Sequence, residues 1–446
     1  MVIGGAVAGL SAIDEDGRRE PAPKAKARTR PRPAAATNQI EYHLLLLLTL
    51  GLVAFGLIMV YSASSGVAVV DGQNPVSPLI REGVYAVLGI GCMAGAARFP
   101  YRRLRLLAPV LMLLALAGLL LVKVPGIGVR INGAQRWIVA GPLTLQPSEF
   151  AKLAMVVFCA AVLTARKRPP RSIREVVNPV GAVALIVCGL VALEPDLGTT
   201  IAIAIMVTGV LIVAGTPFRL LVGTAAIVST GAAFVISQNA YMHARLLAFM
   251  HPWADAGGSG YQNVQALLSL GSGGIWGKGL GQGTVKINYL PEAPSDMIAA
   301  VIGEELGLIG IVVTVLAFAA FAVLGFRVAM RTRDPFGRFL ATGITSLVTG
   351  QAIVNLGAVL GFLPLTGVPL PLISSGGSSL IVFLTLIGTL LNVADGQRAP
   401  VRKVVPADDA TASRPRSRPQ PAGADRSRRN RRPRRAGSGG GRRAHG

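Results

Sequence analysis

The chain has 446 residues, of which 52% are hydrophobic and only 15% are charged, and its mean hydropathy is +0.56. A soluble globular domain carries about 25% charged residues, so this composition, with its many uninterrupted apolar runs, excludes that class and indicates a polytopic membrane protein. The net charge of +23 does not describe the membrane region, because half of the 44 Lys and Arg residues fall in residues 1–42 and 398–446.

These two flanks are rich in Pro, Ala, Gly and Ser and contain almost no large apolar side chains. They cannot bury enough surface to offset the entropy lost on ordering, so 1–42 and 398–446 are predicted to be disordered basic tails. The run Arg426–Arg435 is compatible with nucleic acid, but a polybasic segment held near anionic membrane lipid or a protein partner is favoured, and no nucleic-acid partner is expected. The first 40 residues lack the order of features of a cleaved signal peptide, so none is expected.

Ten apolar segments lie between the tails, and each predicts a transmembrane helix because backbone groups in lipid must hydrogen-bond within their own segment. The segments are 43–62, 82–97, 104–122, 146–165, 177–193, 197–214, 218–237, 298–326, 338–361 and 378–394. The predicted fold class is an all-α polytopic membrane protein with a membrane domain over 43–397. Its largest loop, 238–297, joins the seventh and eighth spans.

Lys and Arg residues in the connections predict the orientation, since cytoplasmic loops carry the excess of positive charge. One set of short loops contains fourteen, namely Arg98, Arg102, Arg103, Arg105, Arg166, Lys167, Arg168, Arg171, Arg174, Arg219, Arg327, Arg331, Arg333 and Arg338. The other set, although longer, contains seven: Arg81, Lys123, Arg130, Arg136, Arg245, Lys278 and Lys286. The first set is therefore predicted to be cytoplasmic, which places both tails inside and the loop 238–297 outside.

Polar residues on the external side are the candidate substrate-binding residues. Arg130 and Arg136 lie in an external loop, and the guanidinium group of arginine can donate two parallel hydrogen bonds to phosphate oxygens. Glu149 and Lys152 are three residues apart at the start of the fourth span, so they share a helix face. They form either a structural ion pair or one wall of a cavity, with Lys152 facing an anionic substrate.

Glu194 and Asp196 flank Pro195 in a tight external hairpin between the fifth and sixth spans. A plain turn accounts for the proline but less well for Glu194 at the end of an apolar span. Further along, the loop 238–297 is rich in glycine, carries Lys286, and is expected to form a lid with a short amphipathic helix.

Asp296 stands where this loop becomes the eighth span. A carboxylate at such a position is half desolvated, can have a shifted pKa and faces whatever enters from the water side. The alternative is an ordinary helix cap, because Ser and Asp are both favoured at helix N-termini.

Residues 363–379 break the helical pattern near membrane depth with three prolines and two adjacent glycines. Irregular backbone there is tolerated where it lines a cavity or is covered by protein. Ser374, Ser375 and Ser378 would supply hydrogen-bond donors for sugar hydroxyls or phosphate. Gln351 and Asn355, four residues apart in the ninth span, are interpreted as interhelical hydrogen-bonding residues. No metal site is expected on the histidines of the membrane domain.

Several separated motifs then resemble, in order, the SEDS family (shape, elongation, division, sporulation) of bacterial cell-wall proteins. They are INGAQRWIVAGPLTLQPSEFAKL (131–153), EPDLGTT (194–200), GSGYQNVQALLSLGSGGIWGKGLGQG (258–283), YLPEAPSDMIAAVIGEELG (289–307) and LPLTGVPLPLISSGGSSL (363–380). The wording PEA and GEELG is more similar to the FtsW-type division branch than to the RodA-type elongation branch, and the basic tails resemble those of actinobacterial members. The resemblance departs from the family at 294–297, which read Pro-Ser-Asp-Met here.

The resemblance implies a peptidoglycan glycosyltransferase in the cytoplasmic membrane, at the division septum. Its substrate would be lipid II, a disaccharide-peptide linked to undecaprenyl diphosphate, and its partners a class B penicillin-binding protein (a transpeptidase) and other division proteins. Asp296 matches the family's essential carboxylate and would act as general base on the acceptor sugar hydroxyl. Arg136 and Lys152 would stabilise the diphosphate leaving group, and a divalent cation, Mg or Mn, could assist.

Three alternatives stay open from the sequence. The chain could be a lipid II flippase, although its acidic residues gather on the outer side only. It could be an elongation-type (RodA-like) polymerase. It could also be a division scaffold without activity, which would not need Asp296.

Overall fold

A computed structural model of the chain describes residues 34–70, 72–131, 134–140, 143–166, 168–238, 240–286 and 290–396. Within these ranges the side chains of 34–38, 131, 134, 140, 143, 227–228, 232–236 and 240–242 are not described. Residues 1–33 and 397–446 of the chain, which include most of the predicted basic tails, lie outside the described residues. Helix α1 (Ala34–Val70) begins ahead of residue 43, where the first span was expected, so the end of the predicted N-terminal tail is helical.

Most of the described chain is helical, which confirms the all-α polytopic class. Eight helical segments are long and apolar enough to cross a membrane: Gln39–Val70 of α1, α2 (Ser77–Arg98), α3 (Tyr101–Leu121), α4 (Pro147–Ala165), Ile173–Ala192, α11 (Ile298–Arg331), α12 (Pro335–Val359) and α13 (Ser378–Gly396). The segment Ile173–Ala192 comprises α5 (Ile173–Val176), η1 (Val177–Gly181) and α6 (Ala182–Ala192). The other two expected spans fall on α7 (Leu197–Val213) and α8 (Phe218–Gln238), whose apolar stretches are shorter, so the count of ten stays a prediction.

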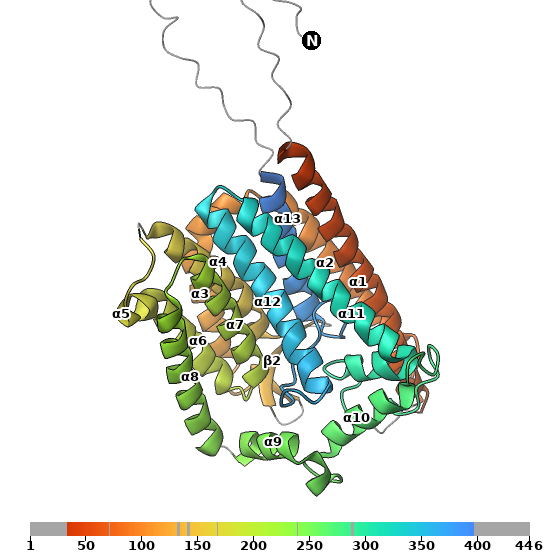
Figure 1. Cartoon of the computed structure of the whole chain (residues 1–446). Helices are drawn as coiled ribbons and strands as arrows, with labels where there is room; N and C mark the ends of the chain where they lie inside the picture. The colour runs from red at the N-terminus through yellow and green to blue at the C-terminus, as the bar shows by residue number, and fades with distance from the viewer. Residues whose placement is uncertain are drawn as a thin grey trace, which may run out of the picture. The chain divides into compact units, whose positions relative to one another are not determined.

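Helix α12 lies in the middle of the bundle, packed against α4, α7, α11 and α13 (Figure 1). It is buried along most of its length because small residues allow its neighbours to approach closely. A Cβ atom at Gly343 would lie 3.1 Å from a methyl group of Val156 on α4, and one at Gly350 would lie 2.6 Å from a methyl group of Ile205 on α7. This central helix therefore touches most of the elements that carry candidate site residues.

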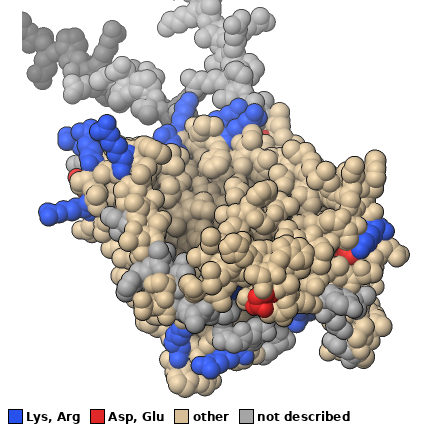
Figure 2. All heavy atoms as spheres, turned by 60° about the horizontal axis from the view of Figure 1, so that its bottom comes forward, with Lys and Arg blue, Asp and Glu red and all other residues tan. Residues whose placement is uncertain are grey.

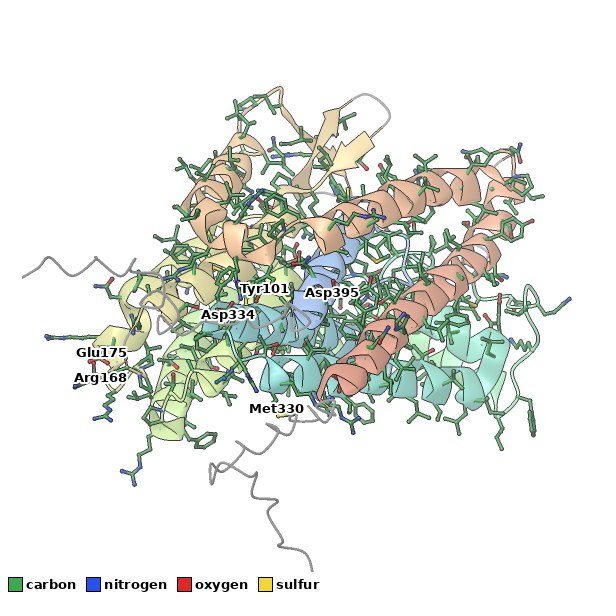
Figure 3. The ribbon with its side chains drawn as sticks, turned by 90° about the horizontal axis from the view of Figure 1, so that it is seen from above. Tyr101, Arg168, Glu175, Met330, Asp334 and Asp395 are labelled. Carbon is green, nitrogen blue, oxygen red and sulfur yellow. The ribbon has the colours of Figure 1, made fainter. Side chains whose placement is uncertain are left out.

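The two ends of the bundle differ. Helices α9 (Ala240–Met250) and α10 (Tyr261–Gly273) lie across the end opposite to the start of α1, and α10 packs against α11 (Figure 1). At the other end, Tyr101, Asp334 and Asp395 lie near the centre of the bundle as seen from above, while Arg168 and Glu175 lie at its edge (Figure 3). The first end carries Asp296, and the second is the end predicted to be cytoplasmic.

A small antiparallel sheet of three strands precedes α4, where only a loop was expected. Strand β1 (Gly128–Ile131) pairs with β2 (Ala134–Ala140), which pairs with β3 (Leu143–Leu145). The sequence contained the signal for it, because an Asn-Gly pair between runs of β-branched and aromatic residues is typical of a hairpin. The sheet carries Arg130 and Arg136 at the same end of the bundle as Asp296.

Candidate active site

The loop that carries Asp296 is fixed by hydrogen bonds from α12 and from the segment 363–377, which are distant in the sequence. Asn355 Nδ2, on α12, donates to the carbonyl oxygens of Asp296 and Val368, each at 2.8 Å. The backbone N–H of Ser375 donates to the carbonyl of Pro294 at 2.8 Å. The acid is therefore held between the end of α12 and the irregular segment 363–377, rather than by its own helix.

The helix-cap alternative for Asp296 is wrong. Helix α11 takes Met297 as its N-cap and has no side-chain cap, and the hydroxyl of Ser295 donates to Glu292 instead. The side chain of Asp296 is only 9% exposed, and its Oδ1 atom has no hydrogen-bond partner within the described part of the chain. A buried carboxylate oxygen without a partner is costly, so this atom is a candidate for contact with a bound group.

The pKa of Asp296 is raised from 3.8 to about 7, chiefly because burial disfavours the charged carboxylate. The negative charge of Glu292 also raises the pKa, and the positive charge of Arg245 lowers it. The acid can therefore exchange a proton near neutral pH, which is the property required of a general base.

Gly367 leaves a small space that both Asp296 and Arg245 border. A Cβ atom at Gly367 would lie 3.7 Å from Nη1 of Arg245 and 3.8 Å from Oδ2 of Asp296, which is ordinary contact distance. Glycine also suits the backbone here, because φ is +71°. An acid and a cation thus face the same small volume. The sequence had identified Arg245 only as one of the external positive charges.

Glu149 and Lys152 are buried together at the start of α4. Lys152 Nζ donates to Oε1 of Glu149 at 2.8 Å and to Oε1 of Gln351 at 2.7 Å, and it lies 4.9 Å from the centre of the Phe383 ring. Gln351 Nε2 donates in turn to the carbonyl of Pro369 at 2.9 Å. Since Gln351 and Asn355 are one turn apart on α12, this cluster and Asp296 are joined through the same helix face and the same irregular segment.

Two acidic residues, Glu194 and Asp196, lie in the hairpin between α6 and α7. Asp196 caps α7 by accepting from the N–H of Thr199 at 3.0 Å, while Arg136 donates from Nε and Nη2 to the carbonyls of Glu194 and Pro195, each at 2.6 Å. Burial, and then the charge of Asp196, raise the pKa of Glu194 to about 8. Arg136 therefore holds the hairpin backbone, and Glu194 is neutral over much of the physiological pH range.

The remaining predicted residues are more dispersed. Arg130 is exposed on β1. Ser374 accepts from the N–H of Leu370 at 2.8 Å, and the hydroxyl of Ser375 donates to Glu82 at 3.0 Å, so both serve the backbone and packing of 363–377. Ser378 is buried at the start of α13, and its hydroxyl has no hydrogen-bond partner among the residues described.

Two neighbouring glutamates on α11, which the sequence did not single out, hold the glycine-rich loop. Glu304 accepts from the backbone N–H of Thr284 at 2.9 Å and pairs with Lys278 at 2.7 Å. Glu305 pairs with Lys286 at 2.5 Å and accepts from Ser62 of α1 at 2.7 Å. Lys286 therefore belongs to a buried ion pair at the edge of the site.

A cavity of about 370 Å³ adjoins the Asp296 loop. Its lining comes from the end of α1, the start of α2 and the loop before α11: Ala63, Ser64, Val67, Ala68, Gln73, Pro78, Lys286, Leu290, Pro291, Glu292, Ala293 and Pro294. The lining is mostly apolar and does not include Asp296 itself. From outside this end of the bundle, an acidic patch lies among uncharged atoms with basic side chains nearby (Figure 2).

Among the described residues, no group of three or more His, Cys, Asp or Glu side chains is arranged to hold a metal ion. The geometry therefore assigns no ligand set to the divalent cation that the sequence left open. The site brings together a buried acid, a nearby guanidinium and backbone carbonyls.

The chain is similar to proteins of bacterial cell-wall synthesis. Residues 42–399 match the family model FTSW_RODA_SPOVE, described as cell cycle protein. The chain is 41% identical over 350 residues to the probable peptidoglycan glycosyltransferase FtsW of Geobacter metallireducens, covering 78% of this chain and 93% of that protein. It is 36% identical over 351 residues to stage V sporulation protein E of Bacillus subtilis, covering 79% and 96%.

Two solved structures are also similar. One chain from a structure described as a peptidoglycan synthase complex that coordinates polymerization and crosslinking matches with a TM-score of 0.67 and 30% identity, over 80% of this chain and 98% of that chain. The rod shape determining protein RodA of Thermus thermophilus matches with a TM-score of 0.58 and 30% identity, over 79% and 96%.

Proposed function

The chain belongs to the FtsW/RodA/SpoVE family of cell cycle proteins, and from that premise we propose that it polymerises lipid II into glycan strands as the peptidoglycan glycosyltransferase of cell division. The observation that carries the proposal is Asp296, a buried acid with a raised pKa and an unpartnered oxygen, at the end of the bundle away from the basic loops.

The reaction takes place on the outer face of the cytoplasmic membrane. The excess of Lys and Arg assigns the opposite end of the bundle, with both tails, to the cytoplasm. A lipid-linked sugar at the outer face can reach the loop before α11 from the surrounding membrane. The cavity beside Glu292 and Pro294 provides space next to that loop.

Asp296 accepts the proton of the acceptor 4-hydroxyl as that oxygen attacks C1 of the donor sugar. The C1–oxygen bond to the diphosphate breaks, and the diphosphate leaves with the electron pair. A carboxylate with a pKa near the working pH suits this role, because it is both ionised often enough and basic enough to take the proton.

Arg136 and Lys152, which the sequence suggested would stabilise the leaving group, are both hydrogen-bonded to other groups of the protein. Arg136 binds the hairpin carbonyls, and Lys152 lies between Glu149 and Gln351. In this proposal they position the segments 194–196 and 366–369 around the substrate. Gly198, at the start of α7, supports this arrangement, because a Cβ there would clash with Val368 at 2.6 Å.

A class B penicillin-binding protein is the proposed partner. The resemblance implies it, and the similar solved chain is described as part of a complex that coordinates polymerization with crosslinking. The protein would act with this transpeptidase and other division proteins at the septum.

The test is polymerisation of fluorescent lipid II by the full-length chain in lipid nanodiscs with its transpeptidase partner. Asp296→Asn should abolish glycan formation while keeping the complex intact. The control substitution Asp255→Asn, at an exposed position, should leave glycan formation unchanged. A parent that moves lipid II across vesicle membranes without forming polymer would support the flippase alternative. An Asp296→Asn variant that polymerises as fast as the parent would refute the assignment of the base.

A further inference from the structure

Arg245 lies on a helix that is peripheral to the bundle. Helix α9 packs mainly against α8 and the short 3-10 helix η2 (Pro252–Asp255), and it exposes Leu247 and Met250. Arg245 is half-buried on the same helix, and its Nη1 atom reaches the carbonyl of Leu365 at 3.4 Å. A peripheral helix thus delivers one cation to the irregular segment beside the acid.

The place that Arg245 reaches is the space left by Gly367. Nη1 of Arg245 and Oδ2 of Asp296 both border that space, at 3.7 and 3.8 Å from the position of the missing Cβ atom. Its charge also acts on the acid, because Arg245 is the cation that lowers the pKa of Asp296 against burial and Glu292. A guanidinium and a carboxyl group that border one space are suited to a group-transfer reaction, in which one stabilises the leaving group and the other takes the proton.

Four other cations near this end of the bundle hold parts of the protein in place. Lys286 and Lys278 are paired with Glu305 and Glu304 and hold the glycine-rich loop. Lys152 is fully buried in its pair with Glu149, and Arg136 donates two hydrogen bonds to the hairpin. None of these contacts directs its charge at Asp296.

We infer that Arg245 is a substrate-contacting residue that binds the diphosphate of the lipid-linked sugar donor beside Gly367 and Asp296. When the acceptor oxygen bonds to C1, the C1–O bond breaks and its electron pair passes to the diphosphate. The proton goes to Asp296, and Arg245 stabilises the added negative charge on the departing oxygen. Arginine suits this role because its planar fork matches two phosphate oxygens and stays charged at every working pH.

This inference rests on the proposed function, so its test measures binding separately from turnover. The full-length chain carries Asp296→Asn in lipid nanodiscs, so that fluorescent lipid II binds without reacting. Adding Arg245→Gln should weaken lipid II binding about tenfold or more, as expected for losing a charge-assisted contact. His243→Gln, an exposed substitution on the same helix, should leave binding unchanged.

A competition experiment identifies the group that Arg245 binds. Undecaprenyl diphosphate should displace lipid II better than undecaprenyl monophosphate, and Arg245→Gln should remove that preference. Arg245→Lys keeps the charge and should lose less affinity than Arg245→Gln, at unchanged thermal stability.

Three results would overturn the inference. They are a lipid II affinity of the Arg245→Gln variant within about twofold of that of the Asp296→Asn chain without it, an intact preference for diphosphate in that variant, or equal losses of affinity in Arg245→Lys and Arg245→Gln. Fast polymerisation by Asp296→Asn alone would instead refute the proposed base, and the Arg245 variants would then be compared by the binding of undecaprenyl diphosphate, which does not polymerise.

Discussion

The pH dependence of glycan synthesis is the sharpest consequence of the buried acid. Asp296 acts as a base only when ionised, and its pKa is about 7 rather than 3.8. About one tenth of the molecules carry the ionised base at pH 6 and about nine tenths at pH 8, so kcat/KM should rise about tenfold over that interval. An acid with an ordinary pKa would give a flat profile there.

Two charge changes test the cause of this shift. Glu292 raises the pKa of Asp296 and Arg245 lowers it. Glu292→Gln should therefore move the inflection of the profile to lower pH, and Arg245→Gln should move it to higher pH. Asp255→Asn removes a negative charge from an exposed position in the same outer loop, and it should leave the inflection in place.

The assay measures initial rates with subsaturating lipid II from about pH 5.5 to about pH 9, in nanodiscs with the transpeptidase partner. Crosslinking is blocked so that only polymerisation is counted. A flat profile in the parent would refute the reasoning, as would a shift of the inflection in the same direction by Glu292→Gln and Arg245→Gln.

Three further outcomes concern stability and positioning. The folded state binds the Asp296 proton more tightly than the unfolded state, so the free energy of unfolding falls as pH rises from about 4 to about 7, by roughly 4 kcal/mol at most. Asp296→Asn has no such proton and should not show this loss. Its melting temperature should therefore exceed the parent's by more at pH 8 than at pH 5. Lys286→Met leaves Glu305 buried without its cation and should cost about 3–5 kcal/mol of unfolding free energy by denaturant titration, much of it restored by adding Glu305→Leu; the half-exposed Lys278 changed to Met should cost less. Asn355→Leu removes both hydrogen bonds that hold the Asp296 loop, so kcat should fall about tenfold or more with lipid II binding retained; an unchanged kcat would exclude this positioning role.

The architecture followed largely from the sequence, because membrane spans are local features. A run of about 20 apolar residues has no alternative in lipid but a helix, and loop charge is read loop by loop. Asp296 could be found in the same way, as one acid at the junction of a polar loop and an apolar helix. The sheet formed by β1 to β3 was missed, although its Asn-Gly signal is also local.

The surroundings of that acid were decided by tertiary structure alone. Lys152 meets Gln351 across 199 residues of sequence, Ser62 meets Glu305 across 243, and Asn355 reaches the carbonyl of Asp296 across 59. Nothing in the local sequence of Arg245 distinguishes it from the other external cations. Periodicity and composition report on near neighbours in the chain, whereas desolvation and charge pairing depend on which distant segments the packed helices bring together. The sequence therefore determined where a reactive acid stands, and the packing of α9, α12 and the segment 363–377 determined its pKa and its partners.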